Sequence, residues 1–323
     1  MRDSVLVADI GGTNVRFGLG TTPAQPVERI RKYKISDFPN PETAVRRYFD
    51  DLGLSAKDLE AIGRACFCAA GPVEDDVVAL TNGSWLIDKE QIARSFALEF
   101  ILINDFSGLA YAIPYLPEDE LLKLGGGEPE AMSPKAIFGP GTGLGVSGSV
   151  PDRHGGWITL SGEGGHVAFA PRRELEDRIL AILRRRITGG RVSAERILSG
   201  AGLEMLFESL AEIEQVPVLP QSAKEIVETG MAEETSLQRQ TISLFCGLLG
   251  KFGGDLALTL GARGGVYVAG GVAQALRDFL PLSPFRTRFE DKGRMQKFNQ
   301  DIPTYLLIGE TPALTGCVAA AQR

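Results

Sequence analysis

Two widely separated segments of this chain share one pattern: an apolar strand-like run, a turn of glycine and threonine, and a second strand-like run. The first segment covers residues 6–19, LVADIGGTNVRFGL, and the second covers residues 136–150, AIFGPGTGLGVSGSV. Thr13 and Thr142 hold equivalent places in the two turns. A repeated supersecondary unit is typical of a duplicated architecture. The repeat therefore predicts two α/β lobes, each opening with its own β-turn-β unit, with a cleft between the halves.

Both turns have the composition of a phosphate-binding loop. Glycine leaves room for a ligand and can take backbone angles that other residues avoid, and a concave group of backbone N–H donors suits an anion. A tight hairpin without a ligand is the alternative for either turn alone. The P-loop pattern G-x-x-x-x-G-K-[ST] is absent. The turn residues concerned are Gly11, Gly12, Thr13 and Asn14, and Gly141, Thr142 and Gly143.

Apolar periodicity predicts a mixed sheet covered by helices in the first lobe. The expected order in the first hundred residues is β-β-β-α-β-α-β, and the duplicated core is β-β-β-α-β-α. The strands are expected near 5–8, 15–19, 28–35, 61–69 and 100–103, and the helices from Pro41 and from a cap at Asp88 to Phe96. We place the small lobe at residues 1–112 plus 303–323.

The large lobe is placed at residues 113–302 and begins with looser sequence. Residues 114–134 and 161–170 are expected to be loops, because they are rich in glycine and proline or lack apolar periodicity. Three helical segments are expected, one around 175–183, one opening at 193–196 and one over 235–258. Strands are expected at 264–268 and 305–308, and a closing helix from Pro312.

Composition excludes several classes of protein. The chain has 323 residues, 44% hydrophobic residues and a net charge of −7, which is ordinary for a globular enzyme and argues against nucleic acid as the main partner. Four cysteines are too few for a disulfide framework, so reduced core thiols in the cytoplasm are expected. Neither a secretion leader nor a run long enough to span a membrane is expected from the sequence.

Five polar residues near glycine-rich or strand-ending positions are candidates for chemistry. Asn104-Asp105 ends an apolar run, where a carboxylate would point toward bound ligand, although a helix cap is the alternative. Glu163 and His166 flank Gly164-Gly165, and Glu195 lies in the third segment. Taken singly, these three are equally well explained as a surface carboxylate, a satisfied histidine and an exposed helical charge.

Together the motifs resemble a definite family. The segments DIGGTN, TNGSW, INDF, GPGTGLG, GEGGH, SAERILSG and GGVYVAGG occur in this order and spacing in bacterial glucokinases of the proteobacterial type. These enzymes belong to the hexokinase–Hsp70–actin superfamily, and the resemblance runs from the first strand to the closing helix. It implies a two-lobed actin-like ATPase fold, related to ribonuclease H, and ATP-dependent phosphorylation of glucose to glucose 6-phosphate. The cysteine-rich zinc motif of the ROK branch is absent.

The resemblance implies a role for each candidate residue. Asp105 would be the general base on the sugar 6-hydroxyl, and Asn104, Glu163, His166 and Glu195 would bind the other hydroxyls. The two glycine turns would hold the phosphates of ATP. Gly270 and Gly271 would lie near the adenosine, and Asp9 would hold Mg²⁺ through water. The implied partners are glucose and ATP, with no nucleic acid or membrane, in a cytoplasmic homodimer.

Three alternatives stay open at this point. A kinase for a related hexose, such as mannose or an amino-hexose, would use the same residues. A non-catalytic sugar-binding regulator would be expected to carry an added helix-turn-helix segment, for which a first strand beginning by residue 5 leaves no room. A nucleotide-driven chaperone or filament protein would give no reason for Glu163, His166 and Glu195.

Overall fold

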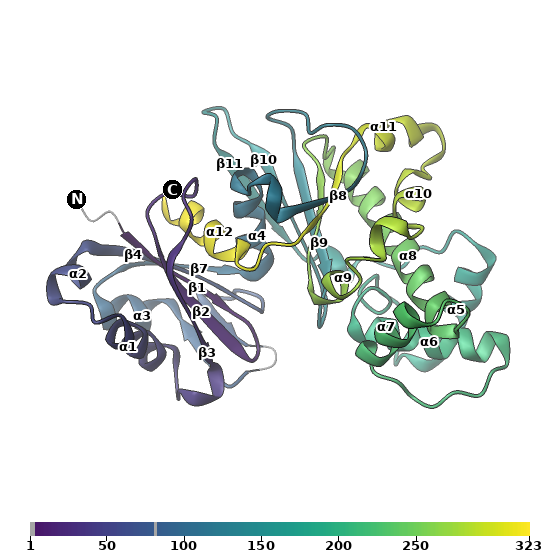
Figure 1. Ribbon diagram of the computed structural model, residues 1–323, viewed down its shortest axis with the longest axis horizontal. Helices are drawn as coiled ribbons and strands as arrows, with labels where there is room; N and C mark the ends of the chain where they lie inside the picture. Colours follow the sequence, from purple (N-terminus) through teal and green to yellow (C-terminus); the bar gives the residue numbers. More distant parts are fainter. Residues whose placement is uncertain (1–3, 81–82) are drawn as a thin grey trace. The chain divides into compact units, whose positions relative to one another are not determined.

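The computed structural model describes residues 4–80 and 83–323, which form two compact units (Figure 1). The first unit contains the chain to Glu118, Trp157–Ser161 and Gly309–Arg323, and the second contains Asp119–Gly156 and Gly162–Ile308. The assignment of Trp157–Ser161 to the first unit differs from the lobe ranges expected from sequence. Thr81 and Asn82 of the TNGSW motif lie outside the described residues.

A five-stranded sheet with the order β3-β2-β1-β4-β7 forms the centre of the first unit. The strand β1 is antiparallel to β2 and parallel to β4, which is parallel to β7. Ile10 pairs with Ala69, and Ala69 pairs with Asn104, so the carboxyl ends of three parallel strands meet at one edge. The bounds are β1 (Ser4–Ile10), β2 (Asn14–Gly20), β3 (Glu28–Lys34), β4 (Ile62–Ala69) and β7 (Glu99–Asn104).

Helices cover both faces of this sheet, which is why β1 is apolar along most of its length. On one face the sheet packs against α1 and α3, with Phe17, Tyr48 and Phe67 in the core. On the other face it packs against α4 and α12 (Figure 1). The helices of this unit are α1 (Pro41–Leu52), α2 (Ala56–Ala61), α3 (Lys89–Phe96), α4 (Asp105–Ala112) and α12 (Pro312–Ala321), and β5 (Val77–Ala79) pairs with β6 (Leu86–Asp88).

Local signals explain where the helices begin and end. The Asn40 side chain accepts the Thr43 N–H at the start of α1, Pro41 occupies its first turn, and Gly53 ends it in a left-handed conformation. The Asp88 side chain caps α3 by accepting the Gln91 N–H. These helix starts are confirmed as predicted.

A second sheet has six strands in the order β11-β10-β9-β12-β13-β8, and all of them except β11 belong to the second unit. Its first five strands repeat the order of the first sheet, with an antiparallel β9–β10 pair and parallel β9–β12 and β12–β13 pairs. The predicted duplication of an α/β core is therefore confirmed. The bounds are β8 (Leu121–Gly125), β9 (Lys135–Pro140), β10 (Leu144–Pro151), β11 (Trp157–Gly162), β12 (Val266–Val268) and β13 (Thr304–Leu307).

One strand lies in a segment where a loop was expected, so the expectation for residues 114–134 is wrong there. The strand β8 pairs with β13, which lies almost 180 residues later in the chain. Pairing with a distant partner stabilises β8, and local β-propensity carries no information about such a partner.

Helix α8 passes beside the second sheet and packs Phe252 against Phe138 of β9 (Figure 1). It has the length and mean hydropathy of a membrane span, but most of it is buried in this unit. Arg185 and Arg186 near the end of α5 form ion pairs with Glu212 of α6. The helices of this unit are α5 (Glu174–Arg186), α6 (Gly200–Glu214), α7 (Ala223–Ala232), α8 (Leu237–Leu260), α9 (Gly271–Ala275), α10 (Phe285–Glu290) and α11 (Gln296–Asp301).

The expectation that a helix opens at residues 193–196 is wrong, because α6 begins at Gly200. Residues 193–195 instead bond backbone to backbone with the preceding glycine-rich loop. The Ala194 N–H donates to the Val167 carbonyl, and the Glu195 N–H donates to the Gly165 carbonyl at 2.9 Å. This pairing takes the donors that a helix start would leave open.

Candidate active site

The first glycine turn joins β1 to β2 directly after Asp9. The Gly11 N–H donates to the Asn14 carbonyl at 3.0 Å and closes the turn, while the Thr13 carbonyl accepts from the Ile35 N–H. Neither Gly11 nor Gly12 has a left-handed φ, so this turn does not use the unusual backbone angles that glycine permits. Because glycine has no side chain, a phosphate can approach the backbone N–H groups closely.

Asp9 lies beside this turn in a largely buried place. Its carboxylate is 3.3 Å from the Arg16 guanidinium, which the hairpin register brings directly opposite on β2. The Cys68 thiol of β4 lies 3.9 Å from the other carboxylate oxygen. Burial raises the pKa of Asp9 above its usual range, and Arg16 partly opposes that shift. Sequence analysis missed Arg16, although the hairpin pairing of β1 with β2 was the signal that would have found it.

Asp105 is the first residue of α4, at the sheet edge where β7 ends. Capping of this helix involves Asn104, whose side chain accepts the Phe106 N–H at 2.9 Å and donates to the Gly71 carbonyl. The Asp105 carboxylate also accepts the Phe106 N–H. Burial, with a smaller contribution from the charge of Asp9, raises the pKa of Asp105 to about 6. A carboxylate with this pKa is suited to accept a proton near neutral pH.

The second glycine turn joins β9 to β10 and is held by two backbone hydrogen bonds. The Gly141 N–H donates to the Gly143 carbonyl at 2.8 Å, and the Gly141 carbonyl accepts from Gly200 at the start of α6. Gly270, just before α9, has a φ of 89°, and a Cβ there would lie 2.4 Å from the Pro140 carbonyl oxygen. The structure therefore brings Gly270 against the end of β9, next to the second turn.

Glu163, His166 and Glu195 form one cluster in the second unit. His166 Nε2 lies 3.8 Å from Glu163, and His166 Nδ1 lies 3.9 Å from Glu195. The Glu163 and His166 side chains are 73% and 54% exposed, whereas that of Glu195 is 30% exposed. A histidine can donate and accept hydrogen bonds, and a carboxylate accepts them with the help of its charge. This cluster therefore suits a polyhydroxyl ligand.

Within each unit the structure thus brings predicted site residues together. Asp9, the first turn, Asn104 and Asp105 gather at one sheet edge of the first unit. The second turn, Gly270 and the cluster of Glu163, His166 and Glu195 lie in the second unit. A direct contact that sequence analysis missed is the Leu144 N–H, which donates to Glu195 at 3.0 Å.

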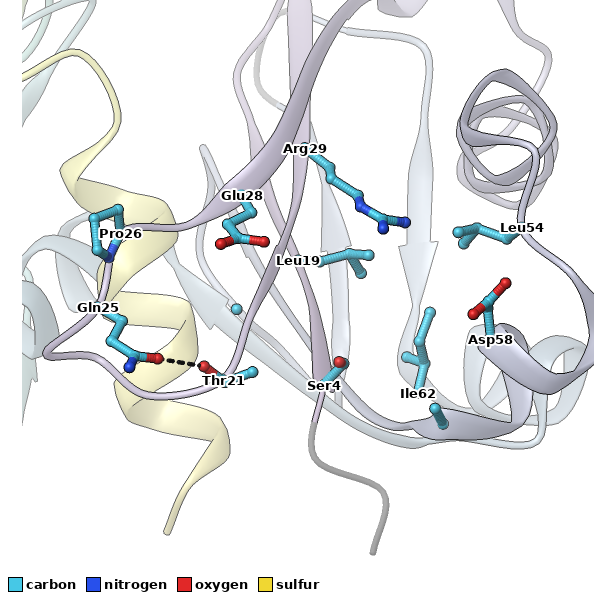
Figure 2. A pocket seen from close by; sticks show the side chains of 12 residues that line it. Ser4, Leu19, Thr21, Gln25, Pro26, Glu28, Arg29, Leu54, Asp58 and Ile62 are labelled. Carbon is cyan, nitrogen blue, oxygen red and sulfur yellow. Dashed lines mark hydrogen bonds between the residues drawn. The ribbon is translucent and has the colours of Figure 1, made fainter.

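A hollow of about 620 Å³ lies elsewhere on the first unit, at the end of the sheet where β1 begins (Figure 2). Figure 2 shows the Arg29 guanidinium extending toward Leu54 and Asp58, with Glu28 on the neighbouring wall. None of the predicted site residues lines this hollow. The hollow is lined by side chains of both charges and shows no arrangement that suggests a reaction. The sheet edge with Asp9 and Asp105, which holds the predicted residues, is therefore the candidate site of this unit.

Comparison with known proteins gives a consistent result over the whole chain. The glucokinase family model matches residues 6–323. A glucokinase of Neisseria meningitidis serogroup C is 41% identical over 316 residues, which cover 98% of this chain and 94% of the relative. The crystal structure of a glucokinase from an Antarctic psychrotroph is 32% identical and aligns over 99% of both chains with a TM-score of 0.89.

A more distant structure shares the fold. The ROK-family glucokinase from Streptomyces griseus, solved in complex with glucose and AMPPNP, is 18% identical and covers 99% of both chains with a TM-score of 0.63. These matches confirm the actin-like α/β architecture that the family resemblance implied.

Proposed function

Because the chain belongs to the glucokinase family, which phosphorylates glucose, we propose that Asp105 is the general base of this reaction. The observation that carries the proposal is the Asp105 carboxylate itself. It is desolvated at the edge where three parallel strands end, within reach of the charge of Asp9, and its pKa is raised to about 6. Structural ion pairing would lower the pKa of a carboxylate, so this shift favours a functional role.

Proton transfer follows from this position. At neutral pH the Asp105 carboxylate is ionised and accepts the proton of the sugar 6-hydroxyl as the hydroxyl oxygen attacks the terminal phosphorus of ATP. The bond from this phosphorus to the bridging oxygen breaks, and ADP leaves. The hydrogen bonds of Asn104 to Gly71 and Phe106 hold the start of α4 in place, so the carboxylate need not reorganise during the reaction. Phosphoryl transfer depends mainly on such positioning and on charge stabilisation.

Sugar selection is proposed for Asn104, Glu163, His166 and Glu195. Each glucose hydroxyl both donates and accepts, and charge-assisted hydrogen bonds to carboxylates are about twice as strong as neutral ones. A site built in this way rejects a sugar that lacks a hydroxyl, because a polar group is then left unpaired. Glucose and an ATP analogue are the ligands present in the structure of the Streptomyces griseus relative, which supports both ligands here.

ATP is proposed to bind through both glycine turns, with Gly270 and Gly271 near the adenosine. Mg²⁺ usually binds proteins through one or two carboxylates and substrate phosphates while keeping several waters. Asp9 fits that role, because its carboxylate is desolvated and close enough to Asp105 to raise the pKa of that residue. Groups of three or more His, Cys, Asp or Glu side chains that could hold a metal ion are absent from residues 4–80 and 83–323. A hydrated ion held by Asp9 would neutralise charge on the transferred phosphoryl group.

Two further expectations stay predictions. These are the homodimer, which the family resemblance implies, and the cytoplasmic location, which was expected from the cysteine content. The second is supported by the four cysteines, which are buried and free, as expected in a reducing compartment.

A coupled phosphorylation assay tests the function directly. The purified chain is supplied with glucose, mannose, glucosamine or fructose and with ATP, ADP or polyphosphate, and product formation is followed. We expect the highest kcat/KM for glucose with ATP. A higher value for mannose or glucosamine would identify a kinase for a related hexose. Glucose binding without turnover for any donor would identify a sugar-binding regulator and contradict the proposal.

Glu163→Gln is expected to weaken glucose binding by about 10- to 100-fold, because a charge-assisted hydrogen bond is lost. Binding of AMPPNP should change less than two-fold. Calorimetric titration with glucose and with AMPPNP measures the two affinities. Glu174→Gln is the matched control, since Glu174 is an exposed first-turn residue of α5. Equal losses for sugar and nucleotide in Glu163→Gln would contradict the assignment of this residue to the sugar.

A further inference from the structure

Glu195 is held by the second glycine turn. One of its carboxylate oxygens, Oε2, accepts the Leu144 N–H at 3.0 Å, and Leu144 directly follows the turn. A Cβ added to Gly143 would lie 2.5 Å from this same oxygen. A Cβ added to Gly141, two residues earlier in the same turn, would have no neighbour within 4 Å. The two glycines of this turn therefore meet different surroundings.

The loop of residues 161–170, which carries Glu163 and His166, also contacts Glu195 and Leu144. The Glu195 N–H donates to the Gly165 carbonyl, and a Cβ on Gly165 would lie 2.1 Å from the Leu144 carbonyl oxygen. Close contacts thus join the turn to the loop that carries His166 through their backbones, and join the turn to Glu195 through its carboxylate. Close-packed backbone segments of this kind transmit small shifts, because interiors have little free volume.

The two carboxylate oxygens of Glu195 have different neighbours. Oε2 accepts from the turn backbone, and Oε1 lies 3.9 Å from His166 Nδ1. A carboxylate oxygen that accepts a backbone N–H makes a charge-assisted hydrogen bond. This bond fixes the carboxylate so that Oε1 faces the side of the cluster formed by His166.

We propose that Gly143 and the Leu144 N–H are positioning groups for sugar binding, acting through the Glu195 carboxylate. The proposal rests on the proposed function of Glu195 as a sugar-binding residue. Gly143 is then needed for the sugar as well as for any phosphate contact of its turn. A shift of the turn when nucleotide binds would also move Glu195, so the affinities for sugar and nucleotide would be coupled, and coupling of this kind is reciprocal.

The test compares Gly143→Ala with Gly141→Ala in the full chain, using calorimetry with glucose in the absence of nucleotide. We expect Gly143→Ala to weaken glucose binding at least ten-fold and Gly141→Ala to change it less than two-fold. A role limited to phosphate binding would leave glucose affinity unchanged in both variants. Glucose affinity of Gly143→Ala within two-fold of the unsubstituted chain would overturn the proposal.

A double-mutant cycle with Glu195→Ala adds a second readout. When the Glu195 carboxylate is absent, Gly143→Ala should cause no further loss of glucose affinity. If Gly143→Ala alone fails to fold, as judged by its melting curve, Glu195→Ala should restore folding, because the close contact is removed. A Gly143→Ala defect of the same size in both backgrounds would overturn the proposal.

These outcomes separate this inference from the proposed function. If the unsubstituted chain neither binds nor phosphorylates a hexose, the proposed function fails. If it does both, while Gly143→Ala binds glucose normally, this inference alone fails.

Discussion

Asp105→Asn is expected to lower kcat for glucose phosphorylation by about 10²- to 10⁴-fold, because the amide cannot accept the proton of the attacking hydroxyl. Glucose affinity should stay within about two-fold, since the amide oxygen still accepts the Phe106 N–H that Asp105 accepts. Steady-state kinetics and calorimetry measure the two quantities. Asp88→Asn is the matched control, because Asp88 caps a helix in the same unit. Retention of kcat within a few-fold in Asp105→Asn would show that Asp105 is not the base.

The pH profile gives an independent check on the same residue. With its pKa raised to about 6, Asp105 in the unsubstituted chain should lose kcat/KM ten-fold per pH unit below about pH 6. The residual activity of Asp105→Asn should lack this acid limb. A limb that persists unchanged in the variant would belong to another group.

The Asp105→Asn substitution should raise the free energy of unfolding, although it lowers activity. The pKa of Asp105 is raised from 3.8 to about 6 in the folded chain, so folding takes up a proton between these values. The free energy of unfolding therefore falls as pH rises through this window, and the full loss is present at pH 8. Asparagine carries no charge, so Asp105→Asn should raise the free energy of unfolding by about 3 kcal/mol at pH 8. At pH 4 the two chains should differ little, which denaturant titration at both pH values can measure.

Asp9→Asn is expected to lower kcat by about 10²- to 10³-fold and to raise the Mg²⁺ concentration needed for half-maximal activity. The physical reason is the loss of the carboxylate charge proposed to hold the hydrated ion. The charge of Asp9 also raises the pKa of Asp105, so the acid limb should move to lower pH in this variant. Kinetics over a range of Mg²⁺ concentrations and pH values measure both effects.

Asp37→Asn serves as the control for Asp9→Asn, because Asp37 is an exposed aspartate of the same unit. The control should keep the Mg²⁺ dependence and the acid limb of the unsubstituted chain. An Asp9→Asn variant with an unaltered Mg²⁺ dependence would contradict the proposed role of Asp9, whatever its kcat.

Much of this molecule follows from local sequence patterns. The two glycine turns, the strands around them, the helix start at Pro41 and the cap at Asp88 were predictable, because period-2 alternation and helix-start signals act over a few residues. The place of Asp105 at the end of a strand was predictable for the same reason. The prediction of a helix start at residues 193–196 was wrong, because the backbone N–H groups there donate to a loop almost 30 residues earlier in the chain.

The chemistry of the site depended on contacts between distant residues. Strand β4 lies between β1 and β7, and this order brings Asp9 and Asp105 close enough for one charge to raise the pKa of the other. The bond from the Leu144 N–H to Glu195 joins residues 51 positions apart. Burial, which raises the pKa of both aspartates, exists only once the sheets have formed.

The sequence by itself therefore determined which residue types stand at the turns and strand ends, because these depend on neighbours in the chain. The tertiary structure alone decided which of them interact. Strand order, register and close backbone packing set the distances between charges and donors, and those distances fix the electrostatics of Asp105 and the orientation of Glu195.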